Sequence, residues 1–97
     1  MSLRFPPDEG VYIPHKDSIL IAGEEPNRYP VLCYVTRGSM IAAGAAPMAQ
    51  IADFLAFFEQ HRKEFEAAVI AAYEAAPSHS VTLDVADILQ FGGTLRP

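Results

Sequence analysis

A segment of about thirty residues, 47–76, constrains the fold most, because its apolar side chains recur with helical spacing. At about 100° per residue, one side of the predicted helix is apolar and the other is polar or charged. The apolar stripe consists of Ile51, Phe54, Leu55, Phe58, Phe65, Val69, Ala72, Tyr73 and Ala76, and the opposite side carries Asp53, Gln60, Lys63, Glu64 and Glu74. The segment predicts one long amphipathic helix whose stripe must be covered by the rest of the chain.

The length of this helix raises a packing problem. A straight helix of about thirty residues spans about 45 Å. A compact domain of 97 residues has a diameter of only about 32 Å. We therefore expect one end of the helix to overhang, to bend or to contact another subunit.

Short apolar runs lie on both sides of the helix, separated by proline, glycine and charged residues. The predicted strands are residues 3–5, 11–13, 18–22, 29–36 and 80–83. In the run 29–36, Val31, Cys33 and Val35 share one face, and the other face is also largely apolar. Such a strand is typical of the interior of a sheet.

These elements predict an α+β fold, in which a small antiparallel β-sheet of about four short strands packs on one long α-helix in the C-terminal half. Asp84 is the predicted cap of a last helical turn, residues 85–89. We expect residues 1–97 to form a single domain with a flexible tail at 92–97. The conformation of the alanine-rich segment 37–49 is left open.

Charge and cysteine content limit the classes of function. Seven basic residues against twelve acidic ones give a net charge of −5, which provides no general attraction to nucleic acid or anionic lipid. The longest uncharged stretch, residues 38–52, is shorter than the roughly twenty residues of a membrane-spanning helix. Arg4, Asp8 and Glu9 interrupt any secretory signal. The single cysteine, Cys33, lies in a predicted strand, which indicates a buried thiol in a reducing cytoplasm.

Arg62 is the main candidate for a binding residue, because it falls within about 20° of the centre of the apolar stripe. A guanidinium in that position needs a carboxylate or another acceptor, since an unpaired buried charge is costly. One interpretation is a site for a small anion or carboxylate ligand, in which His61 and Tyr73 assist Arg62. The other is an internal ion pair. Its candidate acids are Asp17, Asp84 and Asp87.

No residue pattern predicts catalysis, a metal or a cofactor. His15, His61 and His79 are scattered, without the spacing of a metal site. The glycines form no nucleotide-binding motif, and no serine lies in a nucleophile turn. We therefore expect a non-enzymatic protein, with no catalytic residues, no metal and no cofactor.

Two kinds of partner follow from the surface pattern. Ile70 and Phe57 widen the apolar stripe, which favours a homodimer through the helix or an edge strand. The alternative to a dimer is that Ile70 and Phe57 are isolated exposed apolar residues, which are common on protein surfaces. Nucleic-acid binding would require a basic stripe assembled from Arg4, Lys16, Arg28 and Arg37. The acidic surface of the helix disfavours it.

Short segments along the chain resemble the domain of unknown function 1488 family of small bacterial proteins. They are residues 3–5, 18–22, 31–35, 58–62 with Phe65 and Glu66, 81–83 and Asp87. The resemblance covers roughly residues 3–89, and the alanine-rich residues 41–49 depart from it. It implies an α+β fold with an antiparallel sheet on one long helix, and no activity, because none is established for the family.

The sequence thus predicts no specific biochemical function. The first hypothesis is a small cytoplasmic protein that works by binding another protein, as a regulatory or adaptor module. The second is a binder of, or enzyme for, a small anion or carboxylate centred on Arg62. A nucleic-acid-associated regulator is the third and least favoured.

Overall fold

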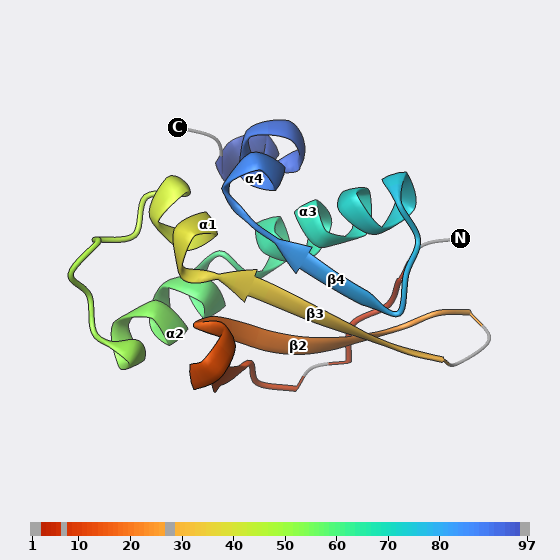
Figure 1. Ribbon diagram of the computed structural model, residues 1–97, viewed down its shortest axis with the longest axis horizontal. Coiled ribbons are helices and arrows are strands. Elements are labelled where there is room, and N and C mark those ends of the chain that lie inside the picture. The colour runs from red at the N-terminus through yellow and green to blue at the C-terminus, as the bar shows by residue number, and fades with distance from the viewer. Residues whose placement is uncertain (1–2, 7, 27–28, 96–97) are drawn as a thin grey trace.

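The computed structural model describes residues 3–6, 8–26 and 29–95 (Figure 1). Its strands are β1 (Val11–Ile13), β2 (Ser18–Glu24), β3 (Pro30–Thr36) and β4 (Ser80–Leu83). Its helices are α1 (Arg37–Ala42), α2 (Ile51–Gln60), α3 (Arg62–Ala75) and α4 (Val85–Phe91), with 3-10 turns η1 (Pro14–Lys16) and η2 (Gly93–Leu95). The predicted α+β class is confirmed.

The four strands form one mixed sheet in the order β1-β2-β3-β4. β1, β2 and β3 pair antiparallel, whereas β3 and β4 pair parallel. The prediction of a wholly antiparallel sheet is therefore wrong in its last pair. α1, α2 and α3 connect β3 to β4 and return the chain to the starting end of the sheet, so β4 runs in the same direction as β3. β3 lies inside the sheet, as predicted.

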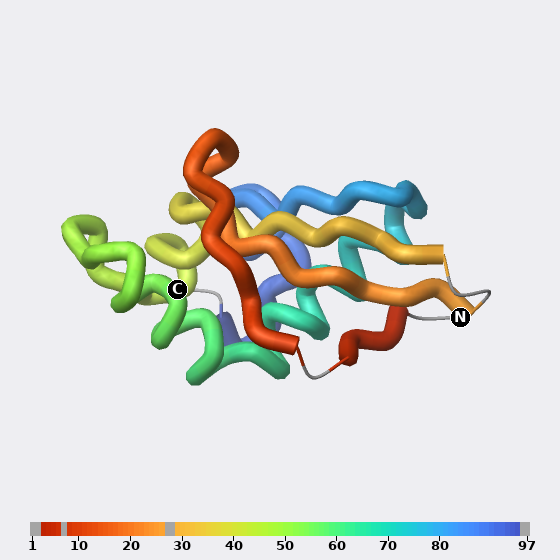
Figure 2. The backbone as a smooth tube through the Cα atoms, turned by 90° about the horizontal axis from the view of Figure 1, so that it is seen from below, coloured from red at the N-terminus to blue at the C-terminus, as the bar shows by residue number. Residues whose placement is uncertain are grey.

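The helical layer lies on one side of the sheet. Figure 1 shows β4 next to α3, and Figure 2 shows α2 and α3 along one side of the strands. Three aromatic side chains of this layer, Phe54, Phe58 and Phe65, are almost completely buried. They pack in one core with the inward-facing side chains of the sheet. These are Ile19, Ile21, Val31, Cys33, Val35, Val81 and Leu83.

The predicted long helix is two helices, α2 and α3, which meet at His61. The backbone there leaves the helical region, with φ −112° and ψ 24°. The helix also begins at Ile51 rather than at Pro47, because Gln50 and Asp53 form a capping box. The later start and the break together remove the packing problem, because α2 has 10 residues and α3 has 14, so the two helices are only about 15 and 21 Å long. The break also lets Phe58 and Phe65 face the same core, with their ring centroids 5.5 Å apart.

The segment left open in the sequence begins with α1. The Thr36 side chain caps this helix by accepting a hydrogen bond from the Ser39 backbone N–H at 3.0 Å. Gly44, with φ 119°, then takes a conformation that side chains rarely adopt. The chain after it reaches α2 without forming another helix.

The C-terminal region continues past α4 into a short turn. Asp84 caps α4 by accepting from the Val85 N–H at 2.8 Å, as expected from the sequence. Residues 93–95 of the predicted tail form the turn η2, and Leu95 at its end is buried in the core. Residues 96 and 97 lie outside the described part of the chain.

Replacing Phe58 by Ala should lower the free energy of unfolding by about 3 to 5 kcal/mol, because it leaves a cavity between α2 and the sheet. Met48→Ala is the control, since Met48 is 89% exposed and its loss should cost less than about 0.5 kcal/mol. Urea titration of both variants measures the difference. Equal midpoints for the two variants would show that the assigned interior face of α2 is wrong.

Candidate functional site

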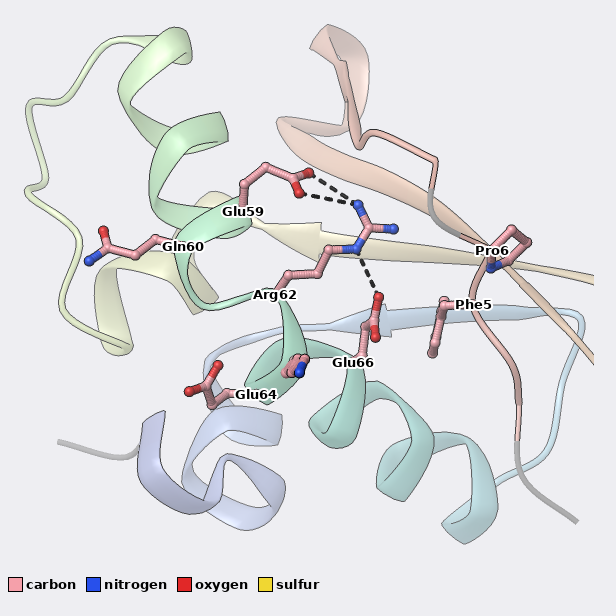
Figure 3. Close-up of a pocket in the computed structure, with 8 residues that line it drawn as sticks. Phe5, Pro6, Glu59, Gln60, Arg62, Glu64 and Glu66 are labelled. Atoms are coloured by element: carbon pink, nitrogen blue, oxygen red, sulfur yellow. Dashed lines mark hydrogen bonds and ion pairs between the residues drawn. The ribbon is translucent and has the colours of Figure 1, made fainter.

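Arg62 is the first residue of α3 and lies directly after the break between the helices. Its side chain is 17% exposed. Figure 3 shows the guanidinium between two carboxylates. Nε donates to Glu66 Oε2 at 2.8 Å, and Nη1 donates to Glu59 Oε2 at 3.1 Å. Because Glu59 belongs to α2 and Glu66 to α3, these bonds brace the two helices across their break.

Arg62 therefore forms an internal ion pair, but with different acids from those expected. Asp17 is bound to Arg37, and Asp84 and Asp87 cap α4. The observed partners lie three residues before and four residues after Arg62, which are the spacings of neighbours on one helix face. This spacing was the sequence signal for the pairs.

The two carboxylates hold Arg62 in its charged form. Burial opposes the charge, but the hydrogen bonds that Arg62 donates to Glu66 and Glu59 outweigh this effect and raise the pKa of the guanidinium. Glu59 also accepts from the Gly10 backbone N–H at 3.4 Å. The cluster thus links the loop before β1 to the break in the helical layer.

A groove of about 590 Å³ lies beside this cluster. It is lined by Phe5, Pro6, Glu59, Gln60, Arg62, Lys63, Glu64 and Glu66. Three of these side chains are carboxylates and two are cations, and Arg62 is already bound to two of the carboxylates. An anionic ligand would have to displace them, so the electrostatics of the groove oppose an anion site, which was one of the two interpretations of Arg62.

The other two predicted site residues make separate contacts. The His61 ring packs on Phe57, with centroids 4.7 Å apart. Tyr73 is not among the residues that line the groove, and its side chain lies near Glu25 instead. Burial, followed by the negative charge of Glu25, raises the pKa of the Tyr73 hydroxyl. The structure places His61 next to Arg62 but does not bring Tyr73 to the same site.

Glu25 is the centre of a cluster that sequence reasoning missed. His79 Nε2 lies 3.8 Å from Glu25 Oε1, and the His79 and Tyr29 rings are 6.2 Å apart. The cluster connects the β2–β3 loop, the last turn of α3 and the segment before β4. Its members are far apart in sequence and follow no motif, so only the fold brings them together.

A second polar cluster forms where β1 meets β2. Asp17, with φ 46°, accepts from Arg37 Nε at 2.9 Å and from the Tyr12 hydroxyl. The hydrogen bond from Arg37, followed by that from Tyr12, lowers the pKa of Asp17. The Arg37 guanidinium also lies 4.4 Å from the centre of the Phe54 ring. These contacts join the start of α1 to β1, to the turn before β2 and to α2.

The basic residues of the nucleic-acid hypothesis do not form a common stripe among the described residues. Arg37 is engaged by Asp17, and Arg4 pairs with Glu24 at 3.4 Å. Lys16 Nζ lies 4.9 Å from the centre of the Tyr34 ring. Arg28 lies outside the described part of the chain.

The described residues offer neither a metal site nor an accessible thiol. They contain no group of three or more His, Cys, Asp or Glu side chains able to hold a metal ion. Cys33 is fully buried, and this burial raises the pKa of its thiol to about 11. In the same part of the chain, no helix combines the length and the apolar character needed to cross a bilayer.

Comparison with known proteins gives a structural match. No family model matches the chain, and no curated protein matches it. A crystal structure from Shewanella loihica, described as a protein of unknown function from the domain of unknown function 1488 family, matches with a TM-score of 0.72 and 14% identity. The match covers 84% of this chain and 91% of the other. It supports the α+β fold class that the sequence resemblance implied.

Glu66→Gln should lower the free energy of unfolding by about 0.5 to 1.5 kcal/mol, because it weakens a charged hydrogen bond to a largely buried guanidinium. Glu64→Gln is the matched control, since Glu64 forms no ion pair with a described residue, and it should stay within about 0.5 kcal/mol. Urea titration at low and high salt measures both. If Glu64→Gln lowered the free energy of unfolding as much as Glu66→Gln, the stabilising role of the Arg62–Glu66 pair would be contradicted.

The Asp17 cluster should make the stability of the fold depend on pH in the acidic range. The folded-state pKa of Asp17 lies below its unfolded value of about 3.8, so ionised Asp17 stabilises the fold above that pH. This contribution falls as the pH drops through 3.8 toward the folded-state pKa. Asp17→Asn should therefore lower the melting temperature at pH 6 and lose less stability than the parent protein between about pH 4 and pH 2. Parallel acid dependence of the two proteins would exclude this contribution.

Proposed function

We propose that the protein is a small non-enzymatic module of the cytoplasm that binds another protein in a regulatory or adaptor role. The observation that supports this proposal is the outer face of the sheet, opposite α2 and α3. In the described part of the chain, no helix covers this face (Figures 1 and 2). The free, buried thiol of Cys33 is consistent with a reducing compartment.

The strand register gives the composition of the outer face. Val11, Leu20, Tyr34 and Thr82 form one row across the four strands. Ala22, Leu32 and Ser80 form the next row across β2, β3 and β4. Val11 is 57% exposed and Leu32 is 42% exposed. The centre of the face is therefore apolar, and the side formed by β4 is polar.

This composition is unusual for a sheet face in water. Antiparallel sheets with one free face normally alternate apolar residues inward and polar residues outward. In β3, however, Leu32 and Tyr34 point outward between the inward Val31, Cys33 and Val35. A face of this kind is better suited to contact with another protein than to hydration.

We also propose that two copies associate, through the helical layer or an edge strand. Ile70 and Phe57 were the sequence evidence for a dimer contact through the helix. Both are half-buried against the core, so the helix offers less apolar surface to a second copy than its sequence indicates. Ile51 at the start of α2 is 45% exposed and Leu89 on α4 is 54% exposed. These side chains favour the ends of the helical layer as contacts.

The alternative function, a small-anion or carboxylate site at Arg62, has the groove in its favour and the two paired glutamates against it. Catalysis would need a group to transfer protons or attack a substrate. The groove offers carboxylates, an amide, a lysine and a guanidinium that is already bound, without a defined nucleophile. Protein binding is therefore the function that the geometry favours.

A photo-crosslinking residue at position 32 should capture a partner in the native cytoplasm, because Leu32 lies at the centre of the outer face. The same residue at position 56 is the control, since Ala56 is exposed on α2. We expect discrete crosslinked products from position 32 and none in common with position 56. No product from position 32, or the same products from both, would contradict binding through this face.

Sedimentation velocity of the purified protein tests self-association separately. A dimer at high micromolar concentration is the expected result. A monomer throughout that range would remove the dimer proposal and leave the crosslinking result unaffected.

A further inference from the structure

We infer that the free edge of β4 is a docking site for an extended peptide, which would add to the sheet as a fifth strand. This inference deepens the proposed function, because it names a class of protein partner. It uses the edge of the sheet rather than its outer face, so the two sites can fail independently.

The peptide groups of β4 alternate between β3 and the free edge. The Leu32 N–H donates to the His79 carbonyl at 2.9 Å, which directs the peptide groups of residue 79 toward β3. Because this direction alternates along a strand, Val81 and Leu83 also face β3. The backbone N–H and C=O groups of Ser80 and Thr82 therefore point away from β3, toward the free edge of the sheet.

Not all of these edge groups are available. The Ser80 N–H donates to Ser78 Oγ at 3.3 Å, and the Asp84 N–H donates to Asp87 Oδ2 at 2.9 Å. No hydrogen bond outside the strand ladders involves the Thr82 N–H, the Thr82 carbonyl or the Ser80 carbonyl, as far as the described residues show. Three backbone groups are thus in position to pair with another strand.

The edge also lacks several of the features that normally prevent strand addition. Natural edge strands carry charged side chains, proline or bulges. β4 has the sequence Ser-Val-Thr-Leu, and its register with β3 is regular over all four residues. The Ser80 and Thr82 side chains are exposed.

α3 provides a floor for an added strand. In Figure 1, the C-terminal half of α3 extends past β4 on the free-edge side, and Figure 2 places it on the helical side of the sheet. Ala67 faces α4, since it lines a groove with Phe91. Ala71 and Ala75 follow Ala67 at steps of four residues, so they continue this side of the helix past α4. Their small side chains favour a peptide with short apolar residues facing α3.

A second copy of this chain is a poor occupant of this edge. Antiparallel pairing of two β4 strands would place them about 4.8 Å apart. The two α3 helices, each extending past its own β4, would then lie closer than the 8–10 Å at which helices pack. The edge therefore fits a segment without a helical layer of its own, and the dimer proposal is left with the other edge and the helices.

The geometry specifies the pattern of the peptide. A residue opposite Thr82 would exchange two backbone hydrogen bonds and point toward the outer face. Its two neighbours would oppose Val81 and Leu83 and point toward α3, so they should be apolar. Asp84 at the end of the edge and the net charge of −5 favour a basic residue at the flank.

Random peptides of about twelve residues displayed on phage are the probe. Selected clones should share the apolar–polar–apolar pattern and bind the parent protein at least about tenfold more tightly than Thr82→Pro. Proline at this position removes only an outward N–H, so the fold should persist. Thr82→Val keeps the N–H and should bind within about twofold of the parent. Equal binding to Thr82→Pro, or no selected clone, would overturn the inference.

Amide hydrogen exchange keeps the test decisive if Thr82→Pro does not fold. A selected peptide should slow exchange of the Thr82 N–H in the parent protein. Protection confined to other residues would overturn the β4 site. Crosslinking from position 32 tests the outer face, whereas peptide binding and hydrogen exchange test the β4 edge. A failure of the proposed function is therefore distinguishable from a failure of this inference.

Discussion

The structure depends on the packing of three aromatic side chains, Phe54, Phe58 and Phe65, against a sheet of short strands. Each is almost completely removed from water, and such side chains contribute about 1.5 to 3 kcal/mol each on burial. Phe54 and Phe58 come from α2 and Phe65 comes from α3, and the Phe58 and Phe65 rings lie with their centroids 5.5 Å apart across the break at His61. Arg62, Glu59 and Glu66 stabilise the angle between the two helices with charged hydrogen bonds.

The main features of the fold follow from periodicity in the sequence. Helical spacing over residues 47–76 located the buried side of α2 and α3, and the two apolar faces of residues 29–36 placed β3 inside the sheet. The break was not visible, because one residue outside the helical region hardly changes the spacing of the apolar stripe. The direction of β4 was also not visible, since parallel and antiparallel strands alternate their side chains in the same way.

The candidate site was predictable only in part. Arg62 stood out because a charge near an apolar stripe needs a partner, and Glu66 four residues later was a local signal for it. The contacts of Tyr73 with Glu25 and of Asp17 with Arg37 depend on tertiary structure, which spacing along the chain does not encode. Arg62 is paired with two glutamates beside a groove. These pairs give it a structural role between α2 and α3, which the sequence presented as a possible ligand contact.

The parallel pairing of β3 and β4 has a consequence for the order of folding. β1, β2 and β3 join through short connections, whereas Val35 and its partner Leu83 are separated by the whole helical region. Closing that long loop costs chain entropy before any contact of β4 compensates for it. The three antiparallel strands can therefore assemble early, and β4 completes the sheet only after α2 and α3 have reached it.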